Sequence, residues 1–299
     1  MSTNTSTKVL SKEEIFALAP PVAGTEKHSR TSDKYTFIPT KQIIEDLRLN
    51  DWLPVHAEVV KARKDEDAVF AKHLLRFRAK ENLSVVLDDG SDIIIPELVI
   101  TNSHDGKNAF RTHIGIFREV CSNGLLAADG VVGAFTSMRV THKGYGQEAV
   151  LEMINNTING FSKVLENIDN YRTLELTPGQ RQEFAEEALW HRWRYEYDRP
   201  VGITPELLLQ SRRKEDHGND LWTVFNVLQE NIIKGGVSGV NADGRQVSSR
   251  AVRNIRESVR INKNLWDLTE NTYNKLYSKP KKGRQSAVIE VEAEVVEVV

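Results

Sequence analysis

The pattern of hydrophobic and polar positions between residues 52 and 142 predicts a series of strands. In each segment apolar residues alternate with polar ones, which places them on one face of an extended chain. Short runs of Gly, Asn and Asp separate the segments and are typical of tight turns. The expected strands are 52–63, 72–80, 83–87, 93–100, 109–118 and 134–142, with a hairpin between the third and fourth.

From about residue 147 the apolar spacing changes to three and four, which predicts helices. These are expected over 150–171, from 178 to near 200, briefly from 205, over 221–234, and from about 250 to the 270s. A Gly-rich loop at 235–244 precedes the last helix. Strands followed by helices indicate an α+β fold, in which a twisted antiparallel sheet is followed by, and packed against, a set of α-helices.

Composition divides the chain into three parts. Residues 1–34 are rich in Ser and Thr and contain only one short helical patch at 11–18, so we expect a flexible N-terminal arm. Residues 35–278 should form a single domain, mainly sheet in 35–145 and mainly helical in 146–278. Residues 279–299 combine a basic linker with an acidic C-terminal tail, which could bind a partner, compete for the protein's own basic surface, or form an edge strand.

Two predicted turns are rich in side chains that can bind a ligand. The first, NSHDG, carries Asn102, His104 and Asp105, and the second, CSNGL, carries Cys121 and Asn123. Turns held by a rigid scaffold often carry function. Asn102, His104, Asp105 and Asn123 therefore form a possible ligand turn, and the alternative is that both turns only set the register and curvature of the sheet.

Arginine gathers on two predicted faces. Arg76 and Arg78 lie on the polar side of the 72–80 strand, which either a solvated sheet face or an anion-binding surface explains. At 100° per residue, the last helix places a second basic set within an arc of about 140°. This ridge consists of Arg250, Arg253, Arg256, Arg260 and Lys263. It suits contacts with nucleic-acid phosphates, and the alternative is a solvated helix whose charges pair with acidic neighbours.

The overall composition mainly argues against certain partners, locations and kinds of site. The 40 basic and 42 acidic residues nearly cancel, so net charge indicates no partner. No hydrophobic run approaches the ~20 residues that cross a bilayer, so we expect no membrane association and a cytoplasmic location. The single cysteine excludes an intramolecular disulfide and a multi-cysteine zinc site. The 235–244 loop lacks the GK[ST] ending of a P-loop, and the histidine spacing fits no compact metal motif, so neither cofactor nor metal is expected.

Several longer motifs resemble one family. They are PTKQIIEDL, AKHLLRFR, NSHDG with FREVCSNGL, HKG at 142–144, RRKEDHGNDLWTVFNVLQENIIKGG, and a last part with Arg250, Val252 and Ile255 followed by Asn264, Leu265 and Trp266. Together they look like the phage- and plasmid-borne family of domain of unknown function 932, which includes the UPF0380 proteins of plasmids and prophages. The resemblance covers about residues 35–276. It implies a mobile-element setting and supplies no agreed activity whose residues could be carried over.

Three hypotheses about function follow from these observations. The first is a non-catalytic nucleic-acid-binding protein, single-stranded DNA being the expected partner, that acts as a homo-oligomer in recombination or replication; single-strand annealing proteins of mobile elements have a similar arrangement of sheet and helices. The second is an anti-defence or regulatory protein that binds a host protein through the acidic tail. The third is a nucleic-acid-processing enzyme that uses His104, Asp105 and His142 as acid, base or metal ligands.

Overall fold

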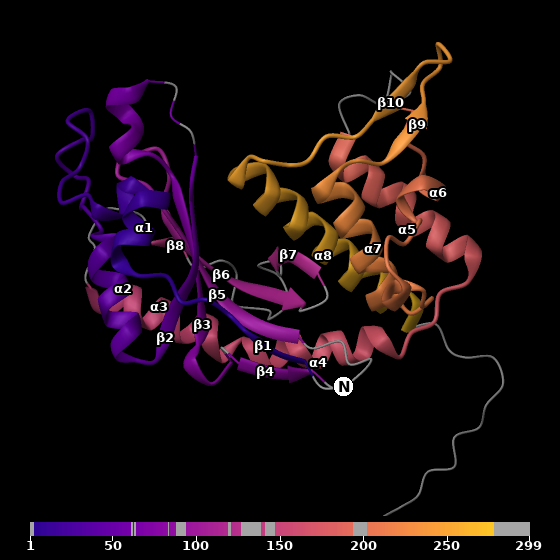
Figure 1. Ribbon diagram of the computed structural model, residues 1–299, viewed down its shortest axis with the longest axis horizontal. Helices are drawn as coiled ribbons and strands as arrows, with labels where there is room; N and C mark the ends of the chain where they lie inside the picture. The colour runs from indigo at the N-terminus through magenta and orange to yellow at the C-terminus, as the bar shows by residue number, and fades with distance from the viewer. Residues whose placement is uncertain are drawn as a thin grey trace, which may run out of the picture.

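An antiparallel sheet forms the centre of the N-terminal half of the protein (Figure 1). The computed structural model describes residues 3–60, 62, 64–82, 84–87, 94–118, 121–126, 139–140, 147–193 and 202–277. The sheet has the strand order β2-β3-β5-β6-β7, and β8 pairs with the opposite end of β6 from β7. Its strands are β2 (Trp52–Val59), β3 (His73–Ala79), β5 (Ile94–Asn102), β6 (Phe110–Arg118), β7 (Cys121–Leu126) and β8 (Arg139–Val140).

Helices pack on the sheet and form a lobe of their own, which confirms the α+β class. The N-terminal lobe combines the sheet with α1 (Lys12–Leu18), α2 (Thr40–Leu49) and α3 (Gln147–Asn159). A connecting helix, α4 (Phe161–Arg172), leads to the helical lobe. That lobe is made of α5 (Pro178–Trp193), α6 (Pro205–Leu208), α7 (Leu221–Lys234), α8 (Ile255–Tyr277) and the hairpin of β9 (Ser238–Val240) and β10 (Gln246–Ser248).

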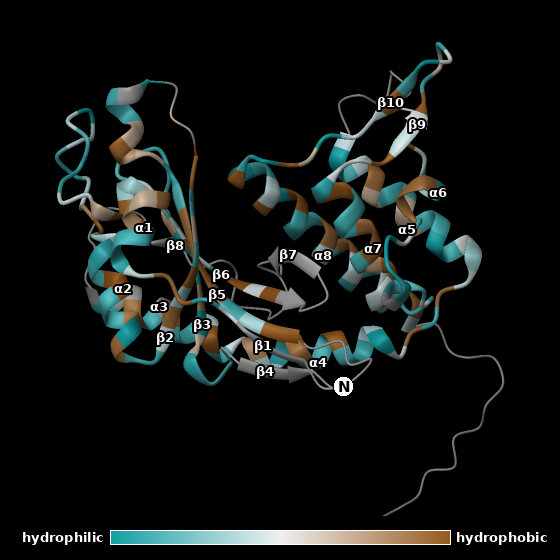
Figure 2. Cartoon of the chain, in the orientation of Figure 1, coloured by the Kyte–Doolittle hydropathy of each residue, from teal (hydrophilic) through white to brown (hydrophobic). Residues whose placement is uncertain are grey.

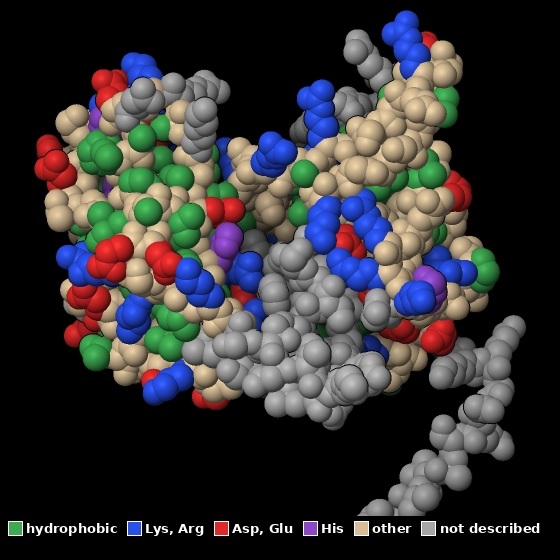
Figure 3. All heavy atoms as spheres, in the orientation of Figure 1, with side chains coloured by type: hydrophobic (Ala, Val, Ile, Leu, Met, Phe, Trp, Pro, Cys, Tyr) green, Lys and Arg blue, Asp and Glu red, His purple; other side chains and the backbone are tan. Residues whose placement is uncertain are grey.

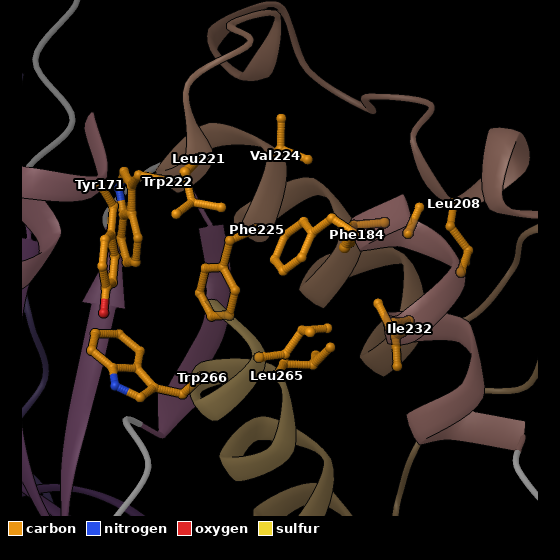
Figure 4. Close-up of a cluster of buried hydrophobic side chains, with 14 of the residues drawn as sticks. Tyr171, Phe184, Leu208, Leu221, Trp222, Val224, Phe225, Ile232, Leu265 and Trp266 are labelled. Carbon is orange, nitrogen blue, oxygen red and sulfur yellow. The ribbon is translucent and has the colours of Figure 1, made fainter. Parts of the chain in front are cut away.

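Each lobe has its own hydrophobic core. In the N-terminal lobe, one sheet face contributes Leu75, Phe77 and Ile100, which pack against Ile43 of α2 and Ile154 of α3. The hydropathy colouring shows apolar and polar stretches alternating along α2, as in an amphipathic helix (Figure 2). In the helical lobe, α4, α5, α7 and α8 bury a larger cluster built around aromatic rings (Figure 4). Its aromatic members are Tyr171, Phe184, Trp222, Phe225 and Trp266. Burial of such large apolar surfaces is the main stabilising contribution to both lobes.

The segment expected to be one helix over 150–171 is two helices, α3 and α4, that meet at Gly160. A Cβ at this position would come within 2.9 Å of the Ile114 side chain on β6. Glycine therefore lets the helix junction lie directly on the sheet.

The expected hairpin between segments 83–87 and 93–100 is wrong. β3 pairs directly with β5, His73 opposite Asn102, so β4 (Ser84–Leu87) is left outside the central sheet. It pairs instead with β1 (Thr3–Ser6). The turn residues in the sequence do not indicate whether β3 or β4 pairs with β5.

The N-terminal residues are folded, which corrects the expectation of a flexible arm. Ser11 and Glu14 form a reciprocal capping box at the start of α1. Ile15 on α1 and Val22 in the following 3₁₀ turn (Pro20–Ala23) are buried in the N-terminal core. The arm is therefore part of the domain, because its apolar residues pack against β2 and α2.

Two further expectations change in the second half of the sheet and after α7. The CSNGL stretch lies in strand β7 instead of a turn, and β8 is the described part of the strand expected over 134–142. The Gly-rich loop forms the β9–β10 hairpin, and α8 consequently begins at Ile255 and not near residue 250. The tail, residues 279–299, and the last residues of the helix expected to reach 200 lie outside the described residues. Within the described chain, no helix has both the length and the apolar character to cross a membrane.

Candidate nucleic-acid interface

A basic cleft of about 370 Å³ lies between the sheet and α8. Figure 3 shows that the surface is hollowed between the two lobes, with Lys and Arg side chains on the helical side of the hollow. Its basic lining residues come from three places in the chain: the start of β3, the β5–β6 connection with β6, and α8. The full lining is Lys72, Thr101, Lys107, Asn108, Ala109, Arg111, His113, Arg256, Val259, Arg260 and Lys263.

Strand register gathers the sheet side of the cleft. Leu74 of β3 lies opposite Thr101 of β5, and Thr101 lies opposite Arg111 of β6. Side chains two residues apart on a strand share a face, so Lys72 lies on the face of Leu74, and His113 on that of Arg111. Lys72 and three further polar residues, Thr101, Arg111 and His113, therefore project from one face of three adjacent strands. The opposite face of the sheet packs on α2 and α3.

The apolar side of α8 positions the helical wall. Asn254 caps the helix, since its side-chain oxygen accepts a hydrogen bond from the Glu257 amide at 3.1 Å. Ile255 and Val259 then pack with Leu74 and Val99 on the sheet. Residues three and four apart lie on one side of a helix, so anchoring these two residues sets the direction of the basic side chains beside them. The basic lining residues of α8 are Arg256, Arg260 and Lys263.

The electrostatics of the cleft favour an anion. Among the described residues that line it, none is acidic. Burial, together with the positive charges of Arg111 and Arg256, holds the pKa of Lys72 below its ordinary value. Two acidic residues lie at the margin of the cleft: Asp105 is 3.7 Å from Lys107, and Glu257 accepts a 2.9 Å hydrogen bond from Arg260.

One polar group in the cleft has unused hydrogen-bonding capacity. Thr101 is 1% exposed, and its hydroxyl has no hydrogen-bond partner among the described residues. Buried hydroxyls usually have a partner, so a ligand oxygen at this position would remove an energetic penalty.

The comparisons with known proteins place the chain in a family. The model of the domain of unknown function DUF932 matches residues 27–266. The chain belongs to the DUF932 family. It is similar to two Escherichia coli (strain K12) proteins, UPF0380 protein YfjQ and UPF0380 protein YafZ, each 35% identical over 261 residues, or 87% of this chain and 90% of the relative. No solved structure matches. Every residue that lines the cleft falls within the DUF932 match.

Three of the five residues predicted on the arginine ridge lie in the cleft of this DUF932 protein: Arg256, Arg260 and Lys263. Arg250 and Arg253 are exposed but precede the helix, so they do not share its ridge. The reason is the β10 strand, whose pairing with β9 is continued by a hydrogen bond from the Ser249 amide to Val237. The chain stays extended there and cannot begin a helix.

Arg76 and Arg78 do not belong to the cleft, which corrects the predicted basic sheet face. Both form ion pairs with Glu97 on β5, and Arg78 donates a 2.7 Å hydrogen bond to it. Arg78 and Glu97 are each only 1% exposed. A buried carboxylate thus holds both guanidinium groups in a structural network, and neither arginine lines the cleft.

The possible ligand turn is a structural turn in its described part. Asn102 and His104 are fully buried, and the Asn102 amide donates to the Ile38 carbonyl at 3.1 Å and to the Thr40 hydroxyl at 3.0 Å. Asp105 accepts hydrogen bonds from Ser103 and from the backbone of the turn. The side chain of Asn123 and all of His142 lie outside the described residues. Over the part of the chain that the structure covers, no three or more His, Cys, Asp or Glu residues are grouped to hold a metal ion.

Sequence reasoning missed most of the sheet side of the cleft. Lys72, Thr101, Lys107 and Arg111 are not among the residues that the sequence predicts for a site. A signal was present, because basic residues fall at the edges of two predicted strands, but only the pairing of β3, β5 and β6 brings them together.

Proposed function

We propose that this DUF932 protein binds nucleic acid, with the phosphate backbone of a single strand lying in the basic cleft. The observation that supports this most is the convergence of six basic side chains from three separate chain segments on one cleft whose described lining contains no acid. Lys and Arg directed at a shared groove form the usual binding surface for nucleic-acid backbones.

The chemistry of the cleft suits phosphate contacts that are independent of sequence. Arginine and lysine donate to phosphate oxygens, and Thr101 and Asn108 add neutral polar groups near the same floor. Burial, together with repulsion from Arg111 and Arg256, lowers the pKa of Lys72, and the negative charge of a bound phosphate would offset both effects. Binding should therefore depend steeply on salt and weakly on base sequence.

The family resemblance suggests where such binding would be used. A protein of mobile elements that holds single strands would serve recombination or replication, and self-association would join the short clefts of neighbouring copies into a longer track. Light scattering with and without oligonucleotide tests the self-association separately from the binding.

A double substitution tests the proposal. K72A/R256A removes one cation from each wall of the cleft, and we expect affinity for a single-stranded oligonucleotide to fall by roughly two orders of magnitude at low salt, as measured by fluorescence anisotropy. The control K163A/R172A removes the same charge from exposed ion pairs on α4 with Glu166 and Asp169, and should change affinity little. Absence of binding by the unaltered protein, or equal loss in both variants, would refute the proposal.

A further inference from the structure

The C-terminal turn of α5 lies beside Arg260, which lines the cleft. The Arg260 guanidinium donates a 3.2 Å hydrogen bond to the carbonyl of His191. One residue further, Arg192 donates to the Arg250 carbonyl at 3.4 Å and lies 4.0 Å from Glu257. These contacts fix the position of the residues around His191 relative to the basic wall.

Trp190, the residue before His191, is exposed to solvent next to this contact with Arg260. It is 43% exposed, whereas Trp222 and Trp266 are buried in the helical core. On α5 it lies about 200° from the buried Ala188, and about 60° from Glu187, which lines a small cavity against α8. Trp190 is therefore on the exposed flank of α5 next to α8. Its ring meets the His191 ring edge-on, with centroids 5.5 Å apart, which leaves indole surface uncovered.

We infer that Trp190 is a stacking platform for an unpaired base of the strand whose phosphates lie in the cleft. The inference rests on the proposed function and adds a second kind of contact to it. An exposed indole face offers base stacking that tolerates any sequence, and a basic groove beside an aromatic side chain is the usual combination in proteins that hold single strands. A base paired within a duplex is not available for this contact, so Trp190 provides selectivity for single strands.

A comparison of two oligonucleotides tests Trp190 apart from the basic cleft. One is an ordinary single strand, and the other is an abasic strand with the same number of phosphates. The full-length protein should bind the ordinary strand about tenfold more tightly than the abasic one. W190A should lose this difference, with affinity for the ordinary strand down about tenfold and affinity for the abasic strand unchanged. W190F, which keeps an aromatic face, should recover most of the loss.

Tyr277 provides a matched control. It is 70% exposed and lies at the other end of α8, about 25 Å along the axis from Arg260 at 1.5 Å per residue. Y277A should leave affinity for both strands unchanged. If W190A binds both strands as the unaltered protein does, or loses affinity for both equally, the stacking role is wrong. The phosphate-binding proposal then still stands, provided that K72A/R256A weakens binding; if the unaltered protein binds neither strand, both proposals fail.

Discussion

Buried His73 should make the stability of the N-terminal lobe sensitive to mild acid. Its Nδ1 lies 3.1 Å from the Ala71 carbonyl and its Nε2 lies 2.9 Å from the Thr40 hydroxyl. This pattern fits a neutral ring that donates to the carbonyl and accepts from the hydroxyl. Burial is the main cause that lowers the pKa of His73 to about 4, against 6.5 for an exposed histidine.

The direction and size of the effect follow from these two pKa values. Because the pKa is lower in the folded state, the contribution to stability is complete above pH 6.5 and is lost as the pH falls from 6.5 towards 4. At pH 5, protonation of this residue raises the ratio of unfolded to folded protein about 30-fold. This corresponds to about 2 kcal/mol of lost stability.

Urea unfolding at pH 7 and pH 5 measures this loss. H73Q removes the titrating group, so the stability difference between the two pH values should be about 2 kcal/mol smaller in H73Q than in the unaltered protein. An equal pH dependence in the two proteins would refute the reasoning. A titration of the His73 ring by NMR gives an independent check, since a midpoint near 6.5 would contradict the burial argument directly.

Three further predictions concern the scaffold and the cleft. E97Q should lower the free energy of unfolding by about 3 kcal/mol or more, because it leaves two arginines without their buried carboxylate. The control E166Q, in an exposed ion pair, should lower the free energy of unfolding by under about 1 kcal/mol. Urea unfolding measures both. G239A should lower the thermal midpoint and expose the β9–β10 hairpin to proteolysis, because an added Cβ would overlap the backbone of residue 202, while G179A, with open space around it, should be neutral or stabilising. Lys72 should react faster than ordinary surface lysines with amine reagents near pH 8, and inorganic phosphate should slow that reaction; equal rates with and without phosphate would contradict an anion site at Lys72.

The elements that depend on local pattern were predictable. The 3.6-residue periodicity located α4, α5, α7 and most of α8, and alternation located β2, β3, β5 and β6. The order of strands and helices was enough for the α+β class, since such sequences have few ways to cover one sheet with helices.

Features that depend on long-range pairing were not predictable. Leu83 to Leu87 looked like the partner of the next strand, yet β5 pairs with β3 because that register buries Leu75 and Phe77 against the helices. The burial of Arg78 could not be foreseen either, because the alternation of segment 72–80 was read as one apolar and one solvated face. In fact α8 packs on Leu74 of the second face, and Arg78 on that face contacts Thr7 and forms an ion pair with Glu97 of β5.

The same distinction applies to the cleft. The helical wall was predicted in part. Arg256, Arg260 and Lys263 follow the helical period and line the cleft, whereas Arg250 and Arg253 precede the helix because the chain continues from the β10 strand there. The sheet wall required the register of three strands, which no local signal contains.

The salt dependence of single-strand affinity tests the central claim most directly. Six basic side chains line the cleft, so a strand that contacts all of them should give a slope of about −4 in a plot of log affinity against log salt concentration, or about 300-fold weaker binding between 50 and 200 mM. K72A/R256A should reduce the slope to about −3, with K163A/R172A unchanged. No binding at low salt, or a slope that the cleft substitutions do not alter, would contradict the account.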